Sequence, residues 1–181
     1  DIVEPTLQGM QEEGTPYRGV LYCGLMITSD GPKVVEYNCR LGDPEAQVIL
    51  PLVESDIVDI FDSLADGTLE GGSLRTAPGS AACVVLASDG YPIEYETGFE
   101  ITGIEDAEAL DDVSVVHAGT RRRDDGVLVT DGGRVLGVTA LGRDLKAALN
   151  RAYEGVDRVQ FQGKTFRPDI GEKGQTRLAD A

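Results

Sequence analysis

An acid, an amide and a guanidinium alternate with other residues in the stretch EYNCRLGDPEAQ, residues 36–47. Glu36, Asn38 and Arg40 follow the apolar start of an expected strand, and since side chains alternate along a strand, all three fall on one face. Carboxylate and amide oxygens are hard ligands for Mg²⁺, and the planar guanidinium can grip a phosphate or a carboxylate. The row suits a magnesium–nucleotide site. An exposed polar face of an edge strand would show the same spacing.

The segments around this row must position it. The apolar stretch 17–28, the turn SDGPK and the strand 34–38 together predict a hairpin over 19–38. Residues 44–67 predict a helix that Pro51 breaks or kinks, with Ser55 as N-cap of its second part. Asp43 could act in the site or could equally cap a helix that starts at Pro44.

A loop rich in Gly, Ser, Thr and Pro, residues 66–80, is the best boundary in the chain. After it, the pattern predicts short strands and then an amphipathic helix over 144–159 with Asp144 near its start. The expected strands are 81–88, 99–104, 113–119, 126–130 and 134–142. We therefore expect an α+β fold in two parts, 1–70 and 71–181.

The charge balance restricts the possible partners. The chain has 32 acidic and 16 basic residues, a net charge of −16, and arginine outnumbers lysine. Such a chain repels nucleic acid and anionic membranes, so we expect neither as a partner. An acidic, lysine-poor composition favours a halophilic protein, with an ordinary acidic cytosolic protein as the alternative.

Three cysteines without a CxxC pair predict neither a disulfide framework nor a zinc site, and they favour the cytoplasm. No signal peptide or membrane helix is expected. Because the first residue is Asp1 and not methionine, we expect the chain to be part of a longer one.

The row Glu36, Asn38, Arg40 resembles the Glu-x-Asn-x-Arg strand of the ATP-grasp ligases. The following RLGDPEAQ fits, at every position, a signature of the phosphoribosylamine–glycine ligase family. The segments GVLYCGLMIT, ASDGYP, ITGI, HAGT, DGGRVLGVTALG and RPDIG are similar to the same family in the same order. The resemblance implies the C-terminal part of an ATP-grasp core, built of antiparallel strands plus helices, over 1–70 and a small mixed α+β C-terminal domain over 71–181.

The resemblance implies an activity in purine biosynthesis: ATP-dependent ligation of glycine to 5-phosphoribosylamine through glycyl phosphate. Glu36 and Asn38 would hold Mg²⁺ or Mn²⁺ on the ATP phosphates, and Arg40 would lie beside the transferred phosphoryl group. Asp43 could orient a substrate amine. Some relatives carry a further metal-binding acid on the preceding strand; this chain has Leu21, Tyr22 and Cys23 nearby, so we expect no such acid there.

A second candidate for substrate binding follows the boundary. Gly132 and Gly133 would let backbone amides approach a ligand, and Arg134 could pair with the ribose phosphate. A hairpin turn with a solvent-exposed arginine is the alternative. The only histidine, His117, is expected to have a structural role.

Two other functions stay open. One is another ATP-grasp carboxylate–amine ligase, against which the Gly-Asp-Pro-Glu run argues. The other is a noncatalytic ligand-binding half. The full-length form is expected to be a monomer, and the 181 residues alone are expected to lack ligase activity.

Overall fold

The computed structural model describes residues 1–179, which divide into two compact units. One comprises residues 1–46 and 53–76, and we call it the hairpin unit. The other comprises residues 47–52 and the chain from residue 77 onward, and we call it the sheet unit. No helix within the described residues is long and apolar enough to cross a membrane.

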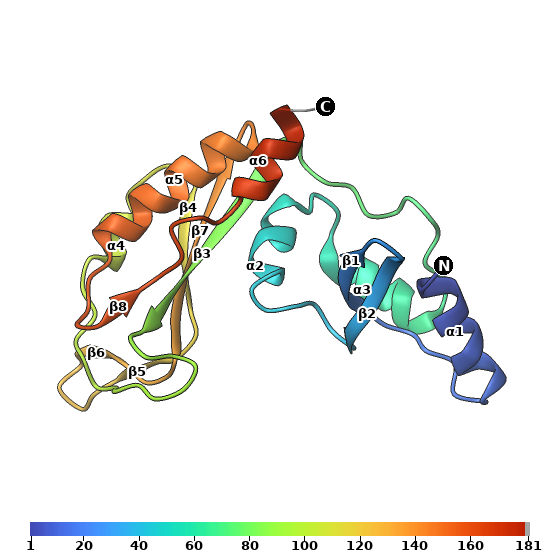
Figure 1. The fold of residues 1–181 in the computed structure, drawn as a ribbon, viewed down its shortest axis with the longest axis horizontal. Helices are drawn as coiled ribbons and strands as arrows, with labels where there is room; N and C mark the ends of the chain where they lie inside the picture. The colour runs from blue at the N-terminus through green and yellow to red at the C-terminus, as the bar shows by residue number, and fades with distance from the viewer. Residues whose placement is uncertain (180–181) are drawn as a thin grey trace. The chain divides into compact units, whose positions relative to one another are not determined.

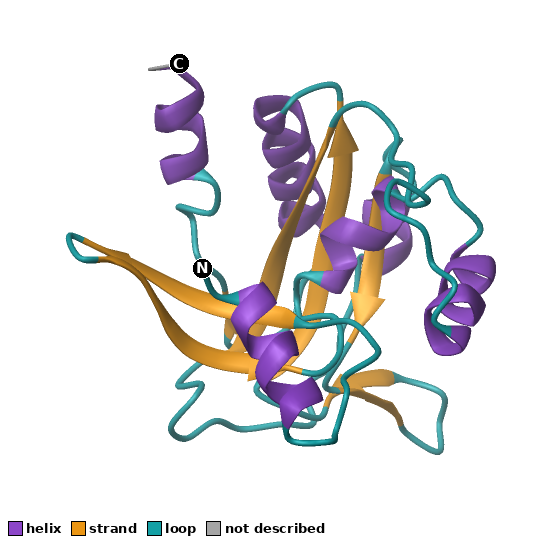
Figure 2. Cartoon of the chain, turned by 90° about the vertical axis from the view of Figure 1, so that its right-hand side faces the viewer, coloured by secondary structure: helices purple, strands orange, loops and turns teal. Residues whose placement is uncertain are grey.

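The hairpin unit is built around two antiparallel strands, β1 (Tyr22–Thr28) and β2 (Gly31–Asn38). Figure 2 shows them as a long twisted ribbon beside a helix. The hydroxyl of Thr28 donates to the carbonyl of Gly31 at 2.8 Å and so closes the turn between the strands. The predicted hairpin is confirmed, although β1 starts five residues later than the apolar pattern begins.

The register of this hairpin shifts by one residue between Gly24 and Leu25. Gly24 pairs with Glu36 whereas Leu25 pairs with Val34, so Val35 is an extra residue on β2. A bulge of this kind changes which side chains share a face beyond it. Here it brings Gly24 opposite Glu36.

Two helices complete the hairpin unit, α1 (Val3–Glu12) and α3 (Ile57–Asp66). The break predicted at Pro51 is confirmed: residues 44–67 contain α2 (Ala46–Ile49), the 3-10 turn η1 (Leu50–Leu52) and then α3. Pro51 interrupts the pattern because it has no backbone N–H to donate.

The predicted N-cap of α3 was wrong by one residue. Asp56 is the N-cap, and its carboxylate accepts from the N–H of Val58 at 2.9 Å. The Ser55 hydroxyl instead donates to the carbonyl of Ser73, and its oxygen accepts from the N–H of Arg75. Ser55 thus ties down the loop after α3.

The sheet unit contains a four-stranded antiparallel sheet in the order β4-β7-β3-β8 (Figure 1). A second ladder joins two short strands, β5 and β6. The strands of this unit are β3 (Ser80–Ser88), β4 (Val113–His117), β5 (Thr120–Arg122), β6 (Leu128–Thr130), β7 (Arg134–Gly142) and β8 (Lys164–Thr165). Its longer helices are α4 (Ile104–Glu108), α5 (Leu145–Arg158) and α6 (Glu172–Ala179).

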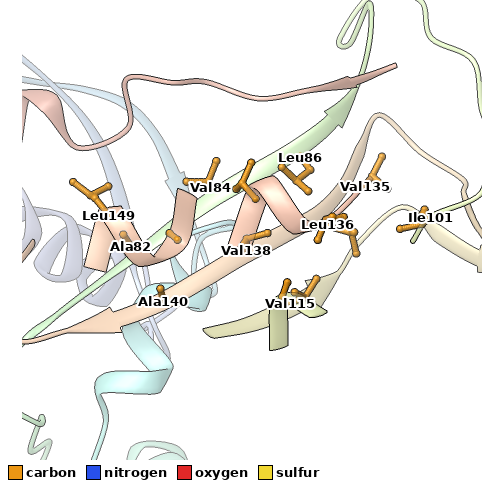
Figure 3. Close-up of a cluster of buried hydrophobic side chains, with 14 of the residues drawn as sticks. Ala82, Val84, Leu86, Ile101, Val115, Val135, Leu136, Val138, Ala140 and Leu149 are labelled. Carbon is orange, nitrogen blue, oxygen red and sulfur yellow. The ribbon is translucent and has the colours of Figure 1, made fainter. Parts of the chain in front are cut away.

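The core of the sheet unit lies between β3, β7 and α5. Val84 and Leu86 from β3 and Leu136 and Val138 from β7 are almost fully buried (Figure 3). Ala148 and other small or apolar residues of α5 pack onto them. Figure 1 shows α5 lying along the sheet. The burial of this apolar surface is the main stabilising contribution in the unit.

One expectation for this unit needs correction. Residues 99–104 form no strand: only single bridges occur, at Glu100 and Thr102, and Ile104 already begins α4. The apolar side chain of Ile101 is buried, which explains the strand-like pattern. Strands over 81–88 and 134–142 and the helix after Asp144 are confirmed.

Candidate functional site

A cavity of about 290 Å³ in the hairpin unit is lined by all four residues predicted there from EYNCRLGDPEAQ. Glu36 and Asn38 reach it from β2, and Arg40 and Asp43 reach it from the loop that follows. The cavity is also lined by Tyr22, Gly24, Leu25, Val35, Gly42 and Glu45. Residues from both strands and from the loop therefore converge on one space.

The strand pairing explains how the acid and the amide meet. Glu36 and Asn38 share a face, and their partners across the ladder are Gly24 and Tyr22. The Asn38 amide nitrogen donates to Glu36 Oε1 at 3.0 Å. One carboxylate and one amide oxygen form a donor set that fits Mg²⁺ or Mn²⁺. Among the described residues, no group of three or more His, Cys, Asp or Glu is arranged to hold a metal ion.

Gly24 makes room for the Glu36 side chain. A β-carbon at position 24 would lie 3.0 Å from Glu36 Cγ, closer than side chains normally approach. The missing side chain lets Glu36 lie over the partner strand.

The loop after β2 carries the remaining predicted residues. The guanidinium of Arg40 donates to the carbonyl of Leu41 at 3.0 Å, and its side chain is exposed. Asp43 is also exposed, within the turn that the hydrogen bond from the N–H of Ala46 to the carbonyl of Gly42 closes at 2.9 Å. A helix starting at Pro44 was wrong, because α2 begins at Ala46.

Sequence reasoning missed Glu45 and Tyr22. The Tyr22 hydroxyl donates to Glu45 Oε1 at 2.9 Å, and both side chains are half-buried. That hydrogen bond is the main cause that raises the pKa of Tyr22 above its ordinary value; burial and the negative charges of Glu45 and Glu36 add to it. Glu45 is part of the segment RLGDPEAQ. Tyr22 is distant from Glu45 in sequence, and the fold brings the two side chains together.

Gly42 is buried, and a β-carbon there would collide with Glu45 Oε2. The Glu45 carboxylate therefore lies directly against the backbone of Gly42. The glycine and the tyrosine together hold this carboxylate in the cavity.

The second group of predicted residues lies in the sheet unit and lines no part of this cavity. Gly132 and Gly133 immediately precede β7, and Arg134 begins it. The backbone N–H of Ser88 donates to the carbonyl of Gly133, and its hydroxyl donates to the carbonyl of Gly132. A β-carbon at Gly133 would collide with the ring of Tyr91, so close packing already accounts for that glycine.

His117 is exposed, and its Nδ1 lies 3.0 Å from the hydroxyl of Thr120. The residue links β4 to the start of β5.

Two protein-family descriptions match different parts of this chain. Residues 1–46, which contain the whole cavity lining, match the family described as phosphoribosylglycinamide synthetase, ATP-grasp (A) domain. The hairpin unit thus carries part of an ATP-grasp fold. The expected fold class, α+β with antiparallel strands, is confirmed.

More than half of the chain, residues 81–173, matches the description phosphoribosylglycinamide synthetase, C domain. The chain therefore belongs to the phosphoribosylglycinamide synthetase family, as the resemblance predicted.

Individual relatives support the same family membership. The chain is 48% identical over 173 residues to a phosphoribosylamine–glycine ligase of Rhodopirellula baltica, covering 95% of this chain and 39% of that protein. It is 50% identical over 181 residues to the trifunctional purine biosynthetic protein adenosine-3 of Gallus gallus, covering 99% of this chain and 18% of that protein.

The crystal structure of phosphoribosylamine–glycine ligase from Thermotoga maritima superimposes with a TM-score of 0.76 at 41% identity. It covers 91% of this chain and 40% of that chain. The chain thus spans about two fifths of the length of the ligases it matches.

Proposed function

We propose that the complete protein containing this chain ligates glycine to 5-phosphoribosylamine with ATP, forming glycinamide ribonucleotide, ADP and phosphate. The reaction is a step of purine biosynthesis. The observation that carries the proposal is the convergence of Glu36, Asn38, Arg40 and Asp43 on one cavity. It occurs in a chain whose relatives include phosphoribosylamine–glycine ligases and a purine biosynthetic protein.

In the first step, a carboxylate oxygen of glycine attacks the γ-phosphorus of ATP, and the bond from the γ-phosphorus to the ADP oxygen breaks. Arg40 lies at the transferred phosphoryl group, where an always-charged guanidinium stabilises the negative charge of the transition state. In the second step, the amine nitrogen of phosphoribosylamine attacks the acyl carbon of glycyl phosphate. Phosphate leaves and the amine loses a proton. Asp43 orients this amine, so positioning supplies much of the rate.

Glu36 and Asn38 would hold a divalent cation, Mg²⁺ or Mn²⁺, through one carboxylate and one amide oxygen. When bound, the cation offsets the charge on the ATP phosphates. The hydrogen bond between the two side chains supports this role, because it fixes both groups on one face of β2.

Gly132, Gly133 and Arg134 are proposed to bind the phosphate of phosphoribosylamine. The basic side chain at the start of β7 supports this assignment. We further propose that residues 1–70 complete an ATP-grasp core and that residues 71–181 form the C-terminal domain of the ligase.

The 181 residues alone are proposed to lack ligase activity, because they cover only about two fifths of the matching ligases. The complete protein is proposed to be a cytoplasmic monomer, adapted to high salt by its excess of acidic residues.

A different ATP-grasp carboxylate–amine ligase is the second candidate. The chemistry of the cavity residues is compatible with any ligase of this class, since one divalent cation and an arginine can stabilise any acyl phosphate. The family match over the C domain favours the glycine ligase. A noncatalytic ligand-binding half is the third candidate.

The test is ADP formation by the purified complete protein in potassium chloride. The proposal expects turnover only when glycine and phosphoribosylamine are both present, and a loss on the order of 100-fold or more in Glu36→Gln. Turnover with another carboxylate but not glycine would support the second candidate. Binding of ribose phosphate without any turnover would support the third.

A further inference from the structure

Glu45 is the one carboxylate of the cavity that the proposed mechanism does not use. It is half-buried, and its Oε1 already accepts the hydrogen bond from Tyr22. Its Oε2 lies against Gly42, and no hydrogen bond to it is described among residues 1–176. A negatively charged oxygen held in place and lacking a donor is ready to accept a hydrogen bond from a ligand.

The charges around the cavity are unequal. Of the residues that line it, Arg40 alone is cationic, whereas Glu36, Asp43 and Glu45 are acidic. An amino acid substrate is a zwitterion that needs a cation for its carboxylate and an anion for its ammonium group. Arg40 can supply the first, and one of the carboxylates must supply the second.

Among the three carboxylates, Glu45 is the best placed for the ammonium group. Glu36 is paired with Asn38 on β2, at the nucleotide end of the proposed site. Asp43 is exposed on the turn. Glu45 is less exposed and is held on two sides, by the Tyr22 hydroxyl and by the Gly42 backbone. A preorganised carboxylate binds a charged donor more tightly because less side-chain freedom is lost on binding.

Resting on the proposed ligase activity, we propose that Glu45, held by Tyr22, binds the ammonium group of the amino-acid substrate. Glu45 contacts substrate, whereas Tyr22 is a positioning residue that acts through Glu45. This pair makes the site select an α-amino acid over a carboxylic acid that lacks the amine.

The test uses the complete protein, saturated with Mg²⁺ and a non-hydrolysable ATP analogue, with calorimetry of glycine binding. Glu45→Gln keeps the shape and the acceptor for Tyr22 but loses the charge, and it weakens glycine binding on the order of 10- to 100-fold. Tyr22→Phe weakens it by roughly 3- to 10-fold and raises the KM for glycine with little change in kcat.

Glycolate, in which a hydroxyl replaces the ammonium group, is the matched ligand. Its affinity stays within about 3-fold in Glu45→Gln, since the charge that is lost has no partner on glycolate. A merely structural role for Glu45 would weaken glycine and glycolate alike.

Two control variants carry the same substitutions outside the cavity. Tyr37 lies in the same hairpin, and its hydroxyl is 2.8 Å from that of Thr6. Glu12 accepts a hydrogen bond from Gln8 at 2.7 Å in α1. Tyr37→Phe and Glu12→Gln leave glycine binding unchanged.

The proposal is overturned if Glu45→Gln binds glycine as the unaltered protein does. It is also overturned if that variant loses affinity for Mn²⁺, measured by electron paramagnetic resonance, and not for glycine, since Glu45 would then be a metal ligand. If the unaltered protein neither binds glycine nor shows glycine-dependent ADP formation, the ligase assignment fails and this proposal fails with it.

Discussion

Gly24 faces Glu36 across the β1–β2 ladder, with so little space that a β-carbon on Gly24 would lie 3.0 Å from Glu36 Cγ. The bulge at Val35 creates this pairing. The position of a proposed metal-binding carboxylate thus depends on a glycine in the neighbouring strand.

Replacing Gly24 with alanine should therefore displace Glu36 without unfolding the hairpin, since a flexible glutamate can move away. We expect the complete protein with Gly24→Ala to bind Mn²⁺ on the order of 10-fold more weakly, as seen when residues supporting metal ligands are changed. Electron paramagnetic resonance of free Mn²⁺ measures this. Lys33→Ala, at an exposed position of the partner strand β2, is the control and should bind Mn²⁺ normally. Unchanged Mn²⁺ affinity in Gly24→Ala would show that Glu36 is not a ligand.

Arg40 is proposed to need its planar fork and not only its charge. Arg40→Lys keeps the charge but cannot make two parallel hydrogen bonds to an anion. We expect kcat of the complete protein to fall on the order of 10- to 100-fold while the KM for ATP changes little. Arg75→Lys, in the exposed loop of the same unit, should leave both constants unchanged. If Arg40→Lys weakened ATP binding by the same factor as it lowered kcat, Arg40 would contact ATP already in the ground state.

In the sheet unit, Gly155 of α5 is buried against two valines. A β-carbon there would lie 2.8 Å from Val138 Cγ1 and 3.1 Å from Val113 Cγ1. Although alanine favours a helix by about 1 kcal/mol over glycine, we expect Gly155→Ala to destabilise the unit by roughly 1–3 kcal/mol because the core is overpacked. Urea unfolding followed by circular dichroism measures the difference.

The same substitution in open space should have the opposite sign. Gly9 lies in α1 with nothing within 4 Å of its would-be β-carbon. Gly9→Ala should therefore stabilise its helix by up to about 1 kcal/mol. If both variants were stabilised, the packing around Gly155 would have to be looser than the structure describes.

Asp144 caps α5, and the hydrogen bond from the N–H of Ala147 at 2.8 Å is the main cause that lowers its pKa below the ordinary 3.8. A carboxyl whose pKa is lower in the folded state stabilises the fold above its ordinary pKa. That stability is lost as the pH falls below about 4 through the folded value. Asp144→Ala should lower the Tm at pH 7 on the order of 5 °C, with a smaller difference at pH 3.

Asp144→Asn separates the cap from the charge. Asparagine also caps a helix, so this variant should stay near the unaltered Tm at pH 7 and lose less stability on acidification. A Tm that depends on pH equally in all three proteins would contradict the role of the Asp144 charge. Thermal melts at pH 3, 5 and 7 provide the comparison.

The excess of acidic residues should make stability depend on salt. With a net charge of −16 the chain repels itself, and potassium chloride at 1 M shortens the screening length to about 3 Å. We expect the Tm to rise steadily between 0.1 and 2 M potassium chloride. The double variant Asp59→Asn and Asp62→Asn, on the exposed side of α3, should show a smaller rise. A flat dependence would favour an ordinary acidic protein over a halophilic one.

The sequence predicted the elements whose hydrophobic pattern is strong and uninterrupted. The alternation in residues 134–142 became β7, and the amphipathic stretch after Asp144 became α5. Glu36 and Asn38 share one face of β2, as their spacing predicted, whereas Arg40 was wrongly placed on the strand and lines the cavity from the loop after it.

The predictions that were wrong or missing concern residues whose structure depends on contacts with residues distant in sequence. Ile101 looks like part of a strand because it is buried, yet its neighbours form only single bridges. Tyr22 could not be placed because counting back from the turn pairs it with Tyr37, whereas the bulge pairs it with Asn38. One extra residue on β2 thus hid the partner of Glu45.

Burial divides the chain unevenly. Every buried apolar side chain among the described residues belongs to the sheet unit, whereas Gly42 is the only buried residue described in the hairpin unit. The buried residues that stabilise the fold are thus different from the residues proposed to bind ligands and take part in catalysis. A thermal-shift screen of variants of this chain would detect substitutions that destabilise β3, β7 and α5. It would not detect substitutions of Glu36 or Glu45 that abolish ligand binding without changing the Tm. Variants of the cavity must be ranked by ligand binding.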